Sequence, residues 1–191
     1  MILQTLGPWP PTVAAYLVLR GSGNRGIIAW IGKRYAIWRL HRGWYLTAAF
    51  LPPTITLVSV GLRSLADPGY QLAPHSPLGE MAANIGLIGT VLLLPLLVLG
   101  QPPSSPLLEE FGWRGFALPL LQARWSALSS SVMLGVVWGL WHLPLMFAYG
   151  EPLIPYLLLI VPQTVLMTWV VNGAKGSMLL AMLFTPGSTP P

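Results

Sequence analysis

Residues 80–100 read EMAANIGLIGTVLLLPLLVLG, and this stretch decides the class of fold. It carries no charged residue after Glu80, and a helix that crosses a membrane needs about 20 predominantly apolar residues. The stretch is therefore the clearest candidate for a membrane-spanning helix. The whole 191-residue chain agrees, because 54% of its residues are hydrophobic and only 8% are charged, against about 25% in soluble domains.

Other apolar stretches flank this one along the chain. They are residues 6–19, 44–62, 127–149 and 153–171, with a further helix that begins at 177–184. We find no strand-like alternation and no internal repeat. Once the loops are subtracted, the chain has room for about five to seven crossings. The sequence therefore predicts an all-α fold, a polytopic transmembrane helical bundle.

The chain divides into three segments. Residues 1–43 hold a short apolar segment and a basic loop, residues 44–184 form the core, and residues 185–191 (TPGSTPP) form an atypical tail. This tail cannot continue the helix before it, because it contains three prolines and a glycine. One hypothesis for the tail is a truncated or shifted reading frame.

The positive charge is concentrated in one segment. The chain has ten Lys and Arg residues against five Asp and Glu, a net charge of +5, and six of the ten bases lie in residues 20–42. A basic segment beside apolar spans is typical of the positive-inside rule and of contact with anionic lipid headgroups. We therefore expect membrane lipids rather than nucleic acid as partners. We also expect an integral protein of a bacterial plasma membrane with residues 20–42 in the cytoplasm.

The structure of this basic segment is left open by its sequence. Interleaved Ile, Trp and Tyr residues favour an amphipathic helix in the membrane interface, whereas a solvated loop fits the charges equally well. The chain contains no cysteine, which excludes disulfides, thiolate metal sites and cysteine nucleophiles.

Two adjacent acids and an arginine form the first candidate site. Glu110 and Arg114 are four residues apart and share a helix face, so they can pair. Glu109 points about 100° away from Glu110 and is left without that partner. An unpaired carboxylate at membrane depth is costly and usually functional. The alternative is that both acids lie in the interface at a helix start, where they favour the helix dipole.

His142 is the second candidate, in the apolar run 136–144 (VVWGLWHLP). A lone histidine on an apolar helix is more often a packing residue than a catalyst. A glutamate and a histidine from adjacent helices can, however, bind and deprotonate a water molecule in a dry site. Trp138 and Trp141 either line that pocket or belong to an interfacial aromatic belt. Proton relay by Glu109 and His142 in a transporter or channel subunit is a further alternative.

Two motifs resemble those of a known family. Residues 109–115 (EEFGWRG) are similar to an EExxxR signature, and residues 138–144 (WGLWHLP) to an FxxxH signature with Trp138 in place of the phenylalanine. These signatures belong to the CPBP intramembrane proteases, which include CAAX prenyl endopeptidases and bacterial proteins linked to bacteriocin processing and self-immunity. The resemblance covers about residues 44–184. The adjacent acids of EExxxR favour this family over a transporter.

The resemblance implies a role for each candidate. Glu109 would activate the attacking water together with His142, and Glu110, held by Arg114, would support the site. The expected activity is that of an intramembrane endopeptidase. It would hydrolyse peptide bonds of membrane-associated peptides or protein tails, of which prenylated CAAX tails are the best-known example in the family.

The family's third motif, HxxxN, is missing from this chain. Its histidine and asparagine would fall at positions 185 and 189, which are Thr185 and Thr189. Loss of an oxyanion donor typically costs about 10²- to 10³-fold in rate, so we expect an impaired enzyme. The alternative is a weakened or inactive member that acts as a bacteriocin-immunity or partner-binding membrane protein.

The family is often described as a metalloprotease group, and the resemblance therefore implies a zinc ion. Glu109 and His142 are the candidate ligands. A catalytic zinc centre uses about three protein ligands, so the two candidates fall short and a tightly bound zinc is not expected.

With residues 20–42 in the cytoplasm, the next polar loop, residues 63–77, is expected on the outside. This orientation can be tested by cysteine labelling, since the chain has no cysteine of its own. A thiol reagent that cannot cross membranes should label Ser76→Cys in intact cells and should label Ser22→Cys only after the cells are opened. Labelling of Ser22→Cys from outside intact cells would contradict the orientation.

Overall fold

A computed structural model describes residues 9–23, 25–66, 84–86, 88–89, 93, 108–149 and 153–185. These residues form helices and turns without any strand, and the prediction of an all-α fold is confirmed for them. Most of the stretch 80–100 lies outside the described residues, and the part of it that is described is helical. Residues 63–66, which were expected to begin a loop over 63–77, are helical. Residues 67–83, 94–107, 150–152 and the tail after Thr185 also lie outside the described part.

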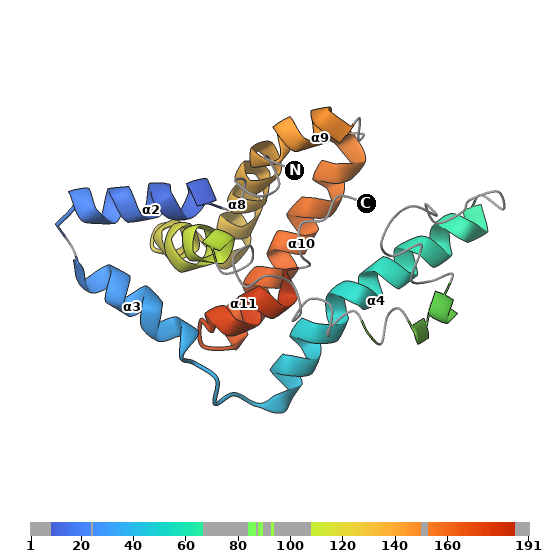
Figure 1. Cartoon of the computed structure of the whole chain (residues 1–191), viewed down its shortest axis with the longest axis horizontal. Coiled ribbons are helices and arrows are strands. Elements are labelled where there is room, and N and C mark those ends of the chain that lie inside the picture. The colour runs from blue at the N-terminus through green and yellow to red at the C-terminus, as the bar shows by residue number, and fades with distance from the viewer. Residues whose placement is uncertain are drawn as a thin grey trace.

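Figure 1 shows how the described helices are arranged. They are α2 (Trp9–Gly21), α3 (Arg25–Tyr35), α4 (Arg42–Ala66), the π-helix η1 (Phe111–Ala117), α7 (Leu118–Gln122), α8 (Ala127–Trp141), α9 (Leu143–Tyr149), α10 (Leu153–Gly173) and α11 (Met178–Phe184). None of the helices in these described ranges is both long and apolar enough to cross a membrane. The number of crossings stays a prediction.

The basic segment contains a helix rather than only a loop. α3 fills residues 25–35, and residues 36–41 that follow it are largely irregular. The helix before it, α2, begins at Trp9 with two prolines in its first turn, where the missing N–H groups have no intrahelical partner to lose.

α8 and α10 run side by side and are joined through α9 (Figure 1). Gly135 of α8 lies against α10, so that a Cβ at this position would stand 3.0 Å from Val161 Cα. The apolar stretch 127–149 is divided into two helices. The helix ends at Trp141 and restarts at Leu143, because Pro144 has no N–H to donate to the turn before it. His142 is therefore the C-cap of α8.

The apolar core lies between α4, α10 and α11. It consists of Ala48, Met167, Val170, Val171, Ala174, Met178, Leu180, Ala181 and Phe184. Ser177 precedes α11 and donates its hydroxyl to the Ile37 carbonyl at 2.7 Å. The short α11 is thereby held against both the core and the end of the basic segment.

The helix that carries the acid pair is widened into the π-helix η1, which the sequence did not predict. α2 and α3 pack closely on two glycines of η1. A Cβ at Gly112 would stand 2.5 Å from the Pro11 carbonyl carbon, and a Cβ at Gly115 would stand 2.9 Å from Ile31 Cγ2. In the same contact, Thr12 donates a hydrogen bond to the Leu108 carbonyl. Glycine at these positions therefore allows the N-terminal helices to reach the acid-bearing segment.

This close contact predicts the effect of a single methyl group. Gly112→Ala should destabilise the protein by about 1–3 kcal/mol, because the backbone of α2 must move to admit the Cβ. Gly32→Ala is the matched control, since a Cβ there meets nothing within 4 Å; it should stabilise α3 by about 0.5–1 kcal/mol. Thermal unfolding of the purified variants measures both changes, and an equal effect of the two substitutions would contradict the packing argument.

Candidate active site

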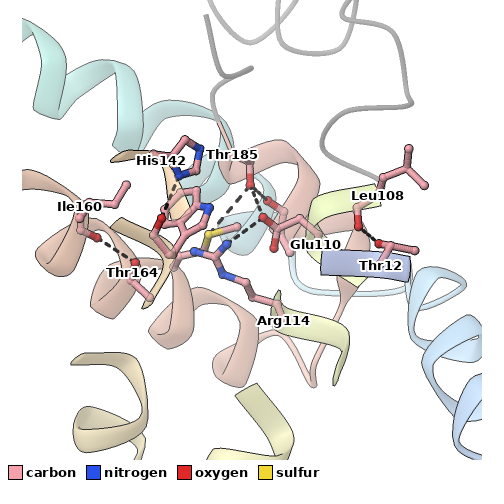
Figure 2. A network of polar contacts seen from close by, with 11 residues as sticks. Thr12, Leu108, Glu110, Arg114, His142, Ile160, Thr164 and Thr185 are labelled. Atoms are coloured by element: carbon pink, nitrogen blue, oxygen red, sulfur yellow. Dashed lines mark hydrogen bonds and ion pairs between the residues drawn. The ribbon is translucent and has the colours of Figure 1, made fainter. Parts of the chain in front are cut away.

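The centre of the site is a buried ion pair. Arg114 Nη1 lies 3.0 Å from Glu110 Oε1, and neither side chain is exposed to solvent (Figure 2). The predicted pairing of these residues is therefore confirmed. Removing two charges from water is expensive, and a buried pair persists only with close geometry and further hydrogen bonds.

Thr185 supplies one of these further contacts. Its hydroxyl lies 2.9 Å from Glu110 Oε1 and 2.9 Å from the Ala181 carbonyl, and its single proton can be donated to one of them at a time. Figure 2 shows Thr185 beside the ion pair. The position at which the family resemblance expects a histidine therefore does reach the site, although the side chain there is a hydroxyl.

Glu109 is the second acid and has a different environment. It is 3% exposed, and none of the described residues forms an ion pair with it. It lies within electrostatic range of Arg114 and of the Trp138 indole. The prediction of one paired and one unpaired acid thus holds for the described part of the chain. Glu109 is the carboxylate that remains available to take up a proton.

His142 reaches the same region through Trp138. His142 Nδ1 lies 2.8 Å from the Trp138 carbonyl oxygen, and the two rings meet edge to face with centroids 5.5 Å apart. The Arg114 guanidinium in turn lies 4.4 Å from the Trp138 ring centroid. A neutral imidazole that donates from Nδ1 keeps its lone pair on Nε2, and that atom can act as a base.

The two tryptophans of this motif differ in their environment. Trp138 is buried at 4% exposure, whereas Trp141 is 38% exposed and packs edge to face on Trp113. The position of Trp138 therefore fits the first alternative from the sequence, a residue that lines the site. The exposure of Trp141 is typical of the other alternative, an aromatic residue at a boundary.

Several buried polar atoms of the site lack a partner among the described residues. They are Glu110 Oε2, Arg114 Nε and Nη2, and Trp138 Nε1. Buried polar atoms in native proteins are nearly always hydrogen-bonded, and exceptions occur often at functional sites. Together these atoms offer three donor nitrogens and one acceptor oxygen to a polar group in the site.

Arg34 is a residue whose role the sequence analysis missed. It is 7% exposed, and its Nη1 donates to the carbonyls of Arg114 and Gly115 at 3.2 Å each. Pro119 follows these residues by five and four positions and has no N–H to offer them. Pro119 removes one backbone donor, and Arg34 supplies a side-chain donor to both carbonyls of this turn of η1. The neighbouring Tyr35 is also affected by the site. Burial raises the pKa of its phenol, and the nearby Glu110 carboxylate raises it further.

The residues present do not fit a zinc centre. Among the residues that the structure describes, no group of three His, Cys, Asp or Glu side chains is close enough to share a metal ion, whereas a catalytic zinc uses about three protein ligands. Glu110 is already engaged by Arg114 and Thr185.

The buried pair predicts a strongly non-additive pair of substitutions. Arg114→Met alone should cost about 3–5 kcal/mol in unfolding free energy, because it leaves the Glu110 charge buried without its partner. The double variant Arg114→Met with Glu110→Leu should recover most of this loss, since no charge of the pair remains. Chemical denaturation of the two variants measures the difference. A double variant less stable than Arg114→Met alone would contradict this account of the pair.

Comparisons with known proteins identify the family of this chain. Residues 87–184 match the family described as type II CAAX prenyl endopeptidase Rce1-like. CAAX prenyl protease 2 of Methanococcus maripaludis is 34% identical over 90 residues, which cover 40% of this chain and 32% of the relative. The matched part thus spans about a third of the relative's length, and no solved structure matches the chain. The family match takes in Glu109, Arg114 and His142 together, and the chain belongs to the Rce1-like CAAX prenyl endopeptidase family.

Proposed function

We propose that this chain is an intramembrane endopeptidase that hydrolyses peptide bonds of membrane-associated peptides or protein tails. The observation that carries the proposal is the buried and unpaired Glu109 beside the neutralised Glu110–Arg114 pair, with His142 linked to that pair through Trp138. The family match supports the same class of reaction.

The proposed reaction needs two proton transfers. Glu109 accepts a proton from a water molecule that His142 Nε2 helps to orient, and the resulting hydroxide attacks the peptide carbonyl carbon. The tetrahedral intermediate then collapses, the C–N bond breaks, and the protonated Glu109 gives its proton to the leaving amine. Because Arg114 offsets the charge of Glu110, the cluster keeps one negative charge, on the residue that must take up the proton.

Charge that develops on the carbonyl oxygen needs hydrogen-bond donors. Arg114 Nη2 and Trp138 Nε1 are buried N–H groups without a well-formed hydrogen bond to a described residue, and the Trp138 indole lies near the Glu109 carboxylate. Donors of this kind, fixed in a dry site, stabilise an oxyanion by about 3–4 kcal/mol each. They support turnover in a chain that lacks the third motif.

A membrane setting is supported by the large apolar side chains on the outside of the described helices. Leu128, Val137 and Leu140 on α8 are 62%, 52% and 51% exposed, and Leu158 and Leu159 on α10 are 69% and 60% exposed. Large apolar side chains exposed in this number are unfavourable in water and are typical of an interaction or membrane surface. We propose about five to seven membrane helices, with residues 20–42 on the cytoplasmic side and membrane lipids and peptide substrates, not nucleic acid, as partners.

The missing third motif supports a second candidate function. A threonine hydroxyl cannot take the place of an imidazole as a base or metal ligand near pH 7. A member of the family that is weakened in this way can still bind a peptide or a partner protein at the same site, and such binding would suit a bacteriocin-immunity role.

Peptide cleavage in proteoliposomes separates the two functions. The wild type should release product from a library of membrane-anchored peptides. Glu109→Gln and His142→Ala should each lower the rate by about 10²- to 10⁴-fold, because each removes a group that handles the proton. Lys33→Gln, which changes an exposed charge on α3, should match the wild type.

Equal product from the wild type and from both site variants would end the protease proposal. Binding of peptides without any cleavage by the wild type would instead support the second candidate.

A further inference from the structure

A second polar feature lies apart from the candidate active site. It is a partly open cavity of about 460 Å³ between α3, the end of α7 and the turn that joins α10 to α11. Its lining includes Trp30, Arg34, Gln122 and Lys175, and neither the acid pair nor His142 takes part in it. This volume falls within the range of ordinary ligand sites, about 300–1,000 Å³.

The side chains around this cavity offer donors and no carboxylate. Arg34 commits Nε to the Gly176 carbonyl and Nη1 to η1, and no described residue accepts a hydrogen bond from its Nη2. Gln122 Nε2 is buried and likewise has no acceptor in the described part of the chain. With the ammonium of Lys175 the cavity carries two positive charges and no acidic side chain. This donor set fits the oxygen atoms of an anion.

The backbone at Lys175 supports a role for its charge. Lys175 has a φ of 56°, the left-handed region that glycine enters without strain and other residues enter at a cost. Gly176 N–H bonds the Val171 carbonyl at 2.8 Å, which closes a Schellman-type end of α10. Glycine is the usual residue at the left-handed position of this turn. A lysine is unusual at this left-handed position, although its charge suits the C-terminal end of α10. It places a positive charge at the rim of the cavity.

We propose that this cavity binds the phosphate group of an anionic phospholipid; the proposal rests on the membrane setting proposed above and not on proteolysis. Trp30 is 48% exposed at the cavity, and the nearby Leu120 and Trp125 are 52% and 45% exposed. Exposed tryptophans are typical of the headgroup level, and basic pockets between membrane helices bind anionic headgroups. A headgroup with its glycerol unit also fills more of the cavity than a free phosphate ion.

The site would connect the lipid to the acid-bearing helix. The Arg34 side chain that faces the cavity also holds the carbonyls of Arg114 and Gly115. A phosphate on its free edge would fix the guanidinium in this position. Lipid binding should therefore raise the melting temperature of the whole protein.

Lipid titration of the purified full chain in neutral detergent tests the proposal. Phosphatidylglycerol, phosphatidylcholine and inorganic phosphate are added in separate arms, and bound lipid is counted by native mass spectrometry beside a melting curve. The wild type should bind phosphatidylglycerol in preference and melt at a higher temperature with it. Lys175→Asn suits the left-handed backbone and should weaken this binding about fivefold. Gln122→Glu keeps the side-chain shape, adds a negative charge and should weaken it further.

Arg124→Gln is the matched control, because it removes one positive charge next to the cavity from a residue that does not line it. It should bind phosphatidylglycerol as the wild type does. Equal binding of phosphatidylglycerol and phosphatidylcholine would overturn the proposal, as would equal loss of binding in all three variants. Stabilisation by inorganic phosphate without any lipid preference would overturn the assignment to a lipid. The lipid titration does not measure cleavage, so its outcome is independent of the protease proposal. A protein that binds the lipid but cleaves no peptide would refute the protease proposal and leave the lipid proposal intact.

Discussion

The buried ion pair between Glu110 and Arg114 is the constraint on which the rest of the described structure depends. Two charges with no solvent exposure are tolerated only where the surrounding groups compensate for their lost hydration. The compensation comes from distant parts of the chain: the Trp138 ring lies under the guanidinium, and the Thr185 hydroxyl lies beside the carboxylate. α8 and α11 are therefore brought to the acid-bearing helix by charge as well as by apolar packing.

The pair also shapes the backbone that carries it. The π-helix η1 starts directly after Glu110, and such wide turns are frequent at functional sites. Pro119 has no N–H for a carbonyl of the turn before it. Arg34 of α3 donates to two carbonyls of that turn, those of Arg114 and Gly115. The basic segment thus contributes a hydrogen-bonded brace to η1, and the glycines of η1 admit the helices that deliver it. Arg34, which the sequence places in a basic segment, is thus buried and helps to hold the backbone of the site in place.

The features that the sequence predicted depend on residues close together in the chain, and the features that it missed depend on residues far apart in the chain. The pairing of Glu110 with Arg114 follows from a spacing of four residues, and the helices α4, α10 and α11 follow from their apolar stretches. The brace by Arg34 joins residues 80 positions apart, and no local pattern distinguishes this arginine from its basic neighbours. The break at His142 has a local cause in Pro144, whereas the apolar character of the stretch 127–149 continues across it. No sequence pattern considered above predicts the π-helix η1.

Thr185 separates the shape of the site from its chemistry. Its hydroxyl still offers a donor to Glu110, so the ion pair keeps a polar neighbour and the end of α11 stays in place without a histidine. A hydroxyl, however, does not change its protonation state near neutral pH, and it brings no second base to the cluster. Under the proposed mechanism the full burden of proton transfer then falls on Glu109 and His142. The fold of the site can therefore persist while its catalytic power is reduced, because packing needs only a hydrogen bond at position 185 and catalysis needs a titratable group.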